Sequence, residues 1–321
     1  MTILAFGYHD RQSPRHRTVC DVLAQEYGPV VECHTEKKGF FAKCADLRRK
    51  FRVMSPDAQT VIVPFPGHFL MPLAWWLTRK PRRQLIFDAF ISLYDTDVSD
   101  RRRYSPLNPR AWMLWWIDII SVHLADEVLI DTEEHKKFFV KHLRLNPKRV
   151  RVIYLEARKD LFHPKQKTQI SNLKTFEIFF YGTLIPLQGV DYILQAAKIL
   201  QDRDANVHFT LVGSSKFPAM IERAGLRNVT TTSFVPMEEL PQMIRSAHLC
   251  LGIFGTSDKA QRVIPHKVVD AVACGVPVLT ADTPAIRERF ANHPLVHLIP
   301  ARNAQAIANS IDDMINNRPT I

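Results

Sequence analysis

Paired cysteines are absent from this sequence. Its 321 residues include five cysteines, scattered along the chain with no C-x-x-C spacing. This excludes a cysteine-rich zinc motif and a disulfide framework, and it favours a reducing compartment. We also expect no signal peptide, because the first ten residues, MTILAFGYHD, lead directly into a strand-like run. We therefore expect a cytoplasmic protein.

An uninterrupted apolar span is missing as well. The most apolar stretch, TVIVPFPGHFLMPLAWWL at residues 60–77, approaches the length of a membrane span. Prolines at positions 64, 66 and 72 would break such a helix. The stretch instead predicts a strand, a turn and a short helix, and we expect no transmembrane helix.

Acidic residues are too few to balance the basic ones, and the net charge is +11. Residues 1–160 hold 27 lysines and arginines against 19 aspartates and glutamates, a net charge of +8. Residues 161–321 hold 16 against 13, a net charge of +3. The basic first half suggests a phospholipid surface, a nucleic acid or a phosphorylated substrate, although a soluble basic surface without a specific partner has the same composition.

Strand-length apolar runs alternate with helix-like segments along the whole chain. Several runs are apolar on both faces, which is typical of parallel strands covered by helices on both sides. Two such series predict an α/β protein with two Rossmann-like, doubly wound domains facing across a cleft. The runs lie at residues 3–8, 30–34, 60–65, 84–90, 127–132 and 151–155, then at 176–182, 207–213, 229–235, 249–254, 276–281 and 296–300.

The predicted domain boundary is the polar, aperiodic segment 160–177, which separates the two strand series. We expect domains at residues 1–160 and 161–321, with the option that the last helix packs back on the first domain. A cleft outside the carboxyl ends of the strands is the default ligand site of this architecture.

The first candidate ligand motif is FFYGTLIPLQGVDYILQAAKIL at residues 179–200. A buried strand ends at Gly182, and Gly189 opens an amphipathic helix. Gly182 permits close approach of a ligand to the backbone, and the helix start offers unpaired N–H groups to a phosphate. An ordinary turn between a strand and a helix uses glycine in the same way, so this motif alone leaves both interpretations open.

The second motif is GIFGTSDKAQRVIPHKVVDAVACGVPVLTAD at residues 252–282. It predicts a helix that starts at Pro265 and ends before Gly275. Lys267 and Asp270 share one face of that helix, and a surface salt bridge between them is the simple interpretation. Lys259 and Arg262 precede the same helix N-terminus, whose dipole repels cations, so an arriving anion explains the cluster better.

These two C-terminal motifs, in this order and spacing, resemble the nucleotide-sugar-binding half of glycosyltransferase family 4, whose fold is GT-B. The family has a glycine loop with a "KG-V" helix start and later a "P-x-K-x-x-E-A-x-A-x-G-x-P-V" helix and strand. LIDTEEHKKFF and RVIYLEARKDLFHP resemble its run into the interdomain linker. The resemblance covers roughly residues 125–315, and it implies a retaining enzyme that uses a nucleotide diphosphate sugar.

The resemblance also implies roles for individual residues. Asp270 stands at the second acidic position of the family's Glu-x7-Glu motif, which implies a contact to the donor ribose. The first acidic position is Arg262 here, and this charge reversal favours a phosphate contact over the usual sugar-hydroxyl contact. Phe234 and Val235 match the region whose backbone reads the base.

The cations of the family's glycine loop are missing, because Thr183 and Gln188 occupy their positions. Lys267, Arg262 and Lys259 are the expected substitutes, which supply positive charge for the donor diphosphate from the other loop. We therefore expect no cofactor beyond the nucleotide sugar.

In the first half the resemblance is thin. GYHDRQSPR at residues 7–15 lacks the double glycine of many relatives. The predicted fourth strand ends where relatives often place a catalytic histidine. Asp88, near the end of this strand, occupies that neighbourhood, and His68 is a second candidate for acid–base work. A buried aspartate that caps a helix or loop is an equally good interpretation of Asp88.

The triplet DTD at residues 95–97 imitates the Asp-x-Asp metal motif of the other large glycosyltransferase fold, GT-A. Three residues make a weak pattern, and this one lies in a polar, charge-rich segment. We interpret it as a loop or helix cap and expect no required metal.

Aromatic and basic residues alternate in two segments, 72–83 and 101–116. Rings beside cations suit an anionic membrane interface, although the rings could also line a core while the arginines are solvated. No nucleic-acid-binding module accompanies the segments, so we expect no nucleic acid partner. The candidate membrane or acceptor residues are Trp75, Trp76, Arg79, Arg101, Arg102, Arg103, Trp112 and Trp115.

Together these features predict a retaining, metal-independent glycosyltransferase. Its acceptor would be a saccharide, lipid-linked, at the inner face of the plasma membrane in envelope or exopolysaccharide synthesis. A GT-B sugar-nucleotide epimerase and a non-catalytic membrane- or nucleic-acid-binding protein on a transferase scaffold remain alternatives.

Overall fold

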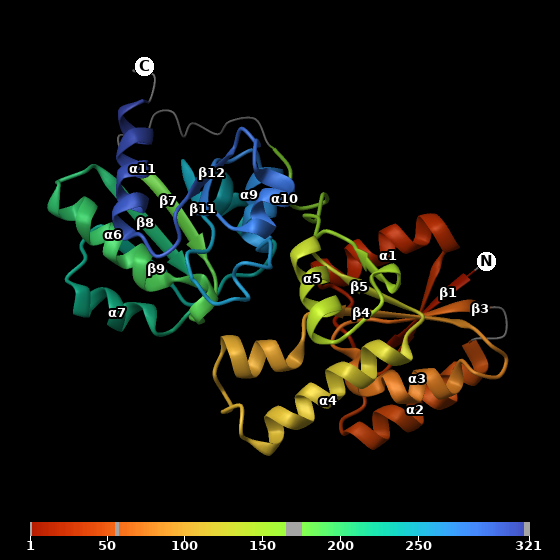
Figure 1. Cartoon of the computed structure of the whole chain (residues 1–321). Coiled ribbons are helices and arrows are strands. Elements are labelled where there is room, and N and C mark those ends of the chain that lie inside the picture. Colours follow the sequence, from red (N-terminus) through yellow and green to blue (C-terminus); the bar gives the residue numbers. More distant parts are fainter. Residues whose placement is uncertain (1, 55–57, 165–174, 318–321) are drawn as a thin grey trace. The chain divides into compact units, whose positions relative to one another are not determined.

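The computed structural model describes residues 2–54, 58–164 and 175–317. The chain divides into two compact units, Met1–Glu156 and Ala157–Ile321. Each unit has a central six-stranded parallel sheet with helices on both faces (Figure 1), which confirms the predicted pair of doubly wound α/β folds. Part of the predicted boundary segment, residues 165–174, lies outside the described residues.

The N-terminal sheet has the strand order β2-β1-β3-β4-β5-β6, and every adjacent pair is parallel. The chain therefore reverses its direction of winding between β1 and β3, where a doubly wound sheet opens at its carboxyl edge. The strands are β1 (Thr2–Gly7), β2 (Val30–His34), β3 (Ala58–Val63), β4 (Gln84–Phe90), β5 (Glu127–Ile130) and β6 (Val150–Val152).

Helices cover both faces of this sheet because its strands are apolar on both faces. Leu4 and Phe6 of β1 pack on one side, and Ile3 and Ala5 pack on the other. The first side is covered by α2 (Phe40–Met54), α3 (Met71–Leu77) and α4 (Pro109–Leu124), and the second by α1 (Pro14–Tyr27). The remaining α-helix of this unit, α5 (Glu133–His142), follows β5.

The C-terminal sheet has the order β12-β11-β10-β7-β8-β9, again with every adjacent pair parallel. Its winding reverses between β7 and β10. The strands are β7 (Phe176–Tyr181), β8 (Val207–Val212), β9 (Val229–Thr232), β10 (Leu249–Leu251), β11 (Val278–Ala281) and β12 (Val296–Ile299). Each of the twelve described strands overlaps a run that the apolar pattern predicts, although β1, β3 and β6 begin one or two residues before it.

The core of the C-terminal unit forms where its longest helices meet the sheet. Side chains of α6 (Val190–Asp202), α7 (Phe217–Ala224) and α11 (Ala304–Asn316) join one continuous apolar cluster with β7 and β8. The apolar face of the last helix, α11, is thus buried in this unit, where α11 packs against α6. The shorter helices are α8 (Leu240–Arg245), α9 (His266–Ala273) and α10 (Pro284–Phe290).

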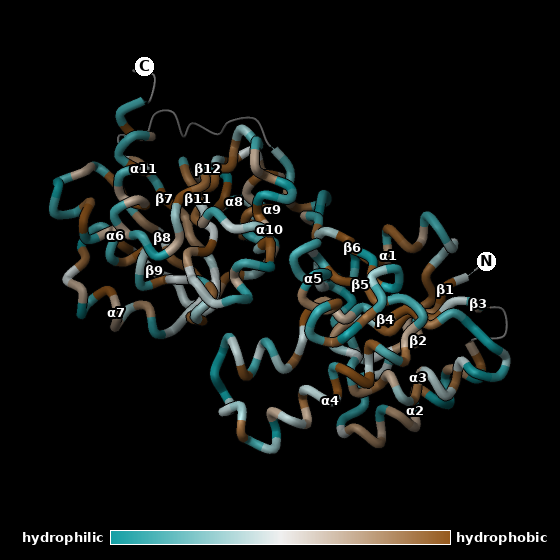
Figure 2. The backbone as a smooth tube through the Cα atoms, viewed as in Figure 1, coloured by the Kyte–Doolittle hydropathy of each residue, from teal (hydrophilic) through white to brown (hydrophobic). Residues whose placement is uncertain are grey.

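Hydropathy follows this layering. In Figure 2 the strands at the centre of each unit are mostly brown, and teal segments dominate the loops and outer helices. Within the described residues, no helix combines the length and the apolar character that a membrane span requires.

Candidate functional site

The C-terminal unit places its two predicted motifs side by side. β7 and β10 are neighbours at the point where the winding reverses, and each runs into a loop and then a helix. The loop after β7 leads to α6, and the loop after β10 leads to α9. Because ligands of open α/β sheets bind outside the carboxyl ends of the strands at this reversal, it is the expected site.

Glycines bring these two loops into backbone contact. A Cβ added at Gly189 would lie 2.5 Å from the backbone of Phe254 and Gly255, and Gly189 has a φ of 66°. A Cβ added at Gly255 would lie 2.2 Å from the carbonyl oxygen of Pro186. Only glycine fits at either position, so these residues hold the start of α6 against the loop that precedes α9.

The helices α6 and α9 both start without a side-chain cap. The N-cap residues are Gly189 and Pro265, and neither offers a side-chain acceptor to the first turn. The first turn of α9 also contains no acidic residue. Pro265 is the N-cap rather than the first helical residue, and Gly275, with a φ of 73°, ends α9 as predicted. Neither start is thus capped by a side chain, although the first turn of α6 carries the acidic Asp191.

Lys267 of α9 reaches across to the loop after β7. Its Nζ donates a hydrogen bond to Oε1 of Gln188 and lies 3.8 Å from the centre of the Phe180 ring. A Cβ added at Gly182 would lie 2.8 Å from this Nζ, so the glycine leaves room for the amine beside the backbone. The structure therefore brings together Lys267, Gln188 and Gly182, which the sequence assigned to one site.

Lys267 is a buried amine without a counter-ion. It is 5% exposed, and burial holds its pKa well below the usual range. Among the residues the structure describes, no carboxylate lies within ion-pair distance of Nζ. The simple interpretation, a surface salt bridge with Asp270, is therefore wrong.

Asp270 has a different partner. The hydroxyl of Tyr181 donates a 2.6 Å hydrogen bond to Oδ2 of Asp270, which is 7% exposed. Burial raises the pKa of Asp270 to about 7, even though the hydrogen bond from Tyr181 lowers it. Sequence reasoning did not single out Tyr181, although its position directly before Gly182 was the available signal.

The other residues predicted to bind the donor differ in how far their side chains are exposed to solvent. Thr183 is exposed in the loop after β7, and Phe234 is 78% exposed after β9, where Val235 lines a neighbouring groove. Lys259 is 8% exposed, and Arg262 is half-buried in the loop between β10 and α9. The side chains of Lys267 and Asp270 are hydrogen-bonded to Gln188 and Tyr181 instead.

In the N-terminal unit Asp88 is held in a buried ion pair. Arg15 Nε and Nη2 lie 3.0 Å and 2.7 Å from Oδ1 of Asp88, and the side chains are 4% and 1% exposed. The Arg15 Nη1 also donates to the carbonyl of Ile153. This geometry ties α1 to β4 and favours the structural interpretation of Asp88 over its role as a general base.

His68 is also buried, with 1% of its surface exposed. Its Nε2 lies 3.2 Å from the carbonyl oxygen of Ile91 and 3.7 Å from Oδ1 of Asp118. Burial lowers the pKa of His68 to about 4, so the ring is neutral and engaged with the backbone. Such a ring links η1 (Gly67–Leu70) to the segment after β4 and has no surface on which to meet a substrate.

The DTD triplet lies on a short π-helical turn, η2 (Asp95–Asp100). Asp95 is buried, and Oδ1 of Asp97 lies 3.7 Å from Arg101 and 3.2 Å from Arg103. The carboxylate of Asp97 therefore offsets part of the positive charge predicted for a membrane patch, while Arg102 is exposed.

The tryptophans divide into two groups. Trp75 and Trp115 pack against the core, with Arg79 over the Trp75 ring at 4.0 Å. Trp76, Trp112 and Trp116 are 52%, 57% and 56% exposed. Trp112 and Trp116 share an exposed stripe of α4 with Met113 and Ile120, and α4 packs against α3, which carries Trp76. The prediction of one aromatic patch thus holds for the outward-facing rings alone.

Two doubly wound parallel sheets in one chain define the GT-B architecture. Residues 163–320 match the family described as "Glycosyl transferases group 1". A curated relative, D-inositol 3-phosphate glycosyltransferase of Mycobacteroides abscessus, is 22% identical over 206 residues, which are 60% of this chain and 44% of the relative. The chain thus spans less than half the length of this relative.

Solved structures share the whole fold. HepE of Anabaena in complex with UDP has a TM-score of 0.70 at 17% identity, covering 99% of this chain and 90% of that chain. Sucrose-phosphate synthase of Thermosynechococcus elongatus has a TM-score of 0.68 at 11% identity, covering 98% and 89%. These similarities show that the chain has the GT-B fold.

Proposed function

We propose that this protein is a retaining glycosyltransferase that moves a hexose from a nucleoside diphosphate sugar to a saccharide acceptor. The C-terminal unit binds the donor at the loops after β7 and β10. The observation that carries this proposal is the buried Lys267, whose Nζ has no anionic partner among the described residues. An unpaired buried cation is costly unless a ligand supplies the missing charge.

The diphosphate would lie between Lys267 and the open N-termini of α6 and α9. Its arrival returns a counter-ion to Nζ and stabilises the charged form of the amine. The same groups then stabilise the negative charge that develops on the departing nucleotide. Because these charges come from the protein, the transfer needs no metal, and Arg262 and Lys259 add positive charge from the adjacent loop.

Asp270 would contact the donor ribose. Tyr181 holds one oxygen of its carboxylate, and the second remains as an acceptor for a hydroxyl. Phe234 and Val235 follow β9, and we assign the base to this side of the site. The Anabaena relative, solved with UDP-glucose, makes UDP-sugars the first donors to test.

The N-terminal unit would face a lipid-linked acceptor in envelope or exopolysaccharide synthesis. Its support is the exposed stripe of Trp112 and Trp116 beside Arg102 and Arg103, together with the net charge of +8 in residues 1–160. We place the protein at the inner, cytoplasmic face of the membrane, where anionic headgroups attract this surface.

The test is a panel of UDP-, GDP- and ADP-sugars, each examined for binding, transfer and hydrolysis. We expect one class to bind and to donate its sugar with retained anomeric configuration. Conversion of the sugar nucleotide without an acceptor would identify an epimerase instead. If no nucleotide sugar binds, the transferase proposal is wrong.

A further inference from the structure

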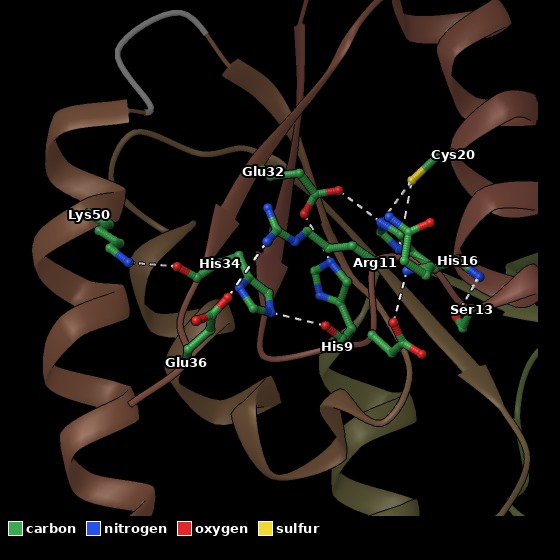
Figure 3. Close-up of polar contacts among 11 residues, drawn as sticks. His9, Arg11, Ser13, His16, Cys20, Glu32, His34, Glu36 and Lys50 are labelled. Atoms are coloured by element: carbon green, nitrogen blue, oxygen red, sulfur yellow. Dashed lines mark hydrogen bonds and ion pairs between the residues drawn. The ribbon is translucent and has the colours of Figure 1, made fainter. Parts of the chain in front are cut away.

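A group of metal-ligating side chains lies in the N-terminal unit, outside every residue assigned above. His9 follows β1, His16 belongs to the first turns of α1, and Glu32 lies in β2. Figure 3 shows each imidazole directed at one oxygen of the Glu32 carboxylate. One ligand atom from each residue lies within 4.8 Å of the others, and no other such group of three occurs among the described residues.

Both rings present the same nitrogen to one carboxylate. Nε2 of His9 lies 2.9 Å from Oε2 of Glu32, and Nε2 of His16 lies 2.8 Å from Oε1. The ring centres are 4.1 Å apart. Two imidazole nitrogens and a carboxylate within 4.8 Å of one another match the ligand types of zinc sites, in which each ligand atom lies about 2 Å from the ion.

Burial and anchoring pre-organise this geometry. His9 and His16 are 3% and 5% exposed, and the three residues come from three separate elements. His34 Nε2 lies 3.0 Å from the backbone oxygen of His9, and Cys20 Sγ lies against the His16 ring, 3.4 Å from the candidate ligand atom Nε2 and 3.8 Å from Nδ1. These outer contacts orient the chain and the ring behind the candidate ligands.

Both Nε2 atoms of the cluster are paired with Glu32, and the remaining features concern the far side of the His9 ring and the solvent-facing carboxylate. Nδ1 of His9 is buried and makes no hydrogen bond within the described part of the chain. Glu32 is 29% exposed and lines a groove of about 570 Å³ with Arg11, Lys37 and other charged side chains, which gives a hydrated ion a path to the carboxylate.

We propose that His9, His16 and Glu32 bind one divalent transition-metal ion of the zinc class. The ion binds the Nε2 lone pair of each histidine, so each neutral ring carries its one proton on Nδ1 and any second proton is released to water. The ion ties the loop after β1 and the start of α1 to β2. Imidazole ligands select zinc-like ions over magnesium or calcium, which prefer oxygen. This ion is distinct from the donor site, whose residues all belong to the C-terminal unit, so the two proposals stand or fall separately.

Chelator-treated full-length protein, titrated with zinc sulfate in a calorimeter, tests this proposal. We expect one zinc per chain and a higher melting temperature with zinc than with the same concentration of magnesium. E32Q keeps the shape of the side chain but removes the anionic ligand. Because loss of an outer partner already weakens binding by 10–100-fold, we expect E32Q to weaken it by roughly 100-fold or more.

H142A, which alters an exposed histidine of α5, is the matched control and should keep wild-type affinity. H16Q serves as the second ligand variant, and circular dichroism verifies that each variant folds. X-ray absorption of the wild-type zinc complex reads the ligands directly, and we expect two imidazoles in the shell. No saturable zinc binding by the wild-type protein, an affinity unchanged in E32Q, or a shell without imidazole would overturn the proposal.

Discussion

Lys267 and Gln188 are hydrogen-bonded across two loops that lie 79 positions apart in the chain. The amine of Lys267 therefore lies beside Gln188. In the glycosyltransferase family that the sequence resembles, a cation stands at the position of Gln188. The sequence predicts that Lys267 substitutes for the missing cation of the glycine loop, and this hydrogen bond is the contact through which it would do so. The buried amine of Lys267 lies next to Gly182. A longer basic side chain at position 188, in place of Gln188, would fill the same space.

The variant Lys267→Met should weaken binding of the donor nucleotide. Methionine fills a similar volume, so the packing against Phe180 is kept while the charge is lost. We expect the dissociation constant to rise by about tenfold or more, or roughly 1.4 kcal/mol. Calorimetric titration with the nucleoside diphosphate of the preferred donor measures it.

Lys198→Met, on the exposed side of α6, is the matched control because Lys198 pairs only with Asp202 there. It should bind nucleotide as the wild-type protein does. Equal affinities for the wild type and the Lys267 variant would remove the phosphate role of this lysine.

The ionisation of Asp270 should make the stability of the C-terminal unit depend on pH. Its pKa is raised from 3.8 to about 7 in the folded state. The contribution of protonated Asp270 to the free energy of unfolding is therefore complete below pH 3.8 and is lost as the pH rises through about 7. Asp270→Asn should lack this loss, which urea unfolding at a series of pH values would reveal. Asp313→Asn on α11 is the control, and a wild-type pH profile in the Asp270 variant would contradict the expectation.

Breaking the Arg15–Asp88 pair should destabilise the N-terminal unit. Asp88→Asn leaves a buried guanidinium without its counter-ion, and such changes cost about 3–5 kcal/mol. Thermal or urea unfolding measures the loss, whereas the exposed Asp202→Asn should cost less than about 1 kcal/mol. A variant with unchanged stability but no transfer activity would instead restore Asp88 as a general base.

Binding to anionic membranes should depend on the arginines that precede α4. Neutralising Arg101, Arg102 and Arg103 to glutamine removes about 1 kcal/mol of attraction per charge, so vesicle affinity should fall on the order of 100-fold. Flotation with anionic and neutral vesicles at rising salt measures it, because exposed charges are screened. Glutamine at Lys216, Arg223 and Arg227 in the C-terminal unit is the control, and equal flotation of both variants would exclude the patch.

The aromatic part of this surface is tested separately. Replacing Trp112 and Trp116 by serine removes apolar area that is already exposed, so folding should be preserved. We expect weaker flotation that does not recover at low salt, since the lost contribution is hydrophobic. Undiminished flotation would show that these rings do not enter the interface.

The sequence by itself determined the elements. Apolar runs of strand length identified all twelve strands, and Gly189, Pro265 and Gly275 marked the ends of helices, because these signals act through neighbouring residues. The order of the two C-terminal motifs was enough to place Gly182, Gln188 and Lys267 in one site.

The tertiary structure alone decided the partners of the side chains. Asp270 is hydrogen-bonded to Tyr181 rather than to Lys267, and Asp88 forms a buried ion pair with Arg15, 73 positions away. The sequence pattern also did not predict which tryptophans of α3 and α4 face outward. Nor did it predict that His9, His16 and Glu32 lie close together. The reason is physical: periodicity assigns a residue to a face of its own element, but its partner depends on how distant elements pack against that face.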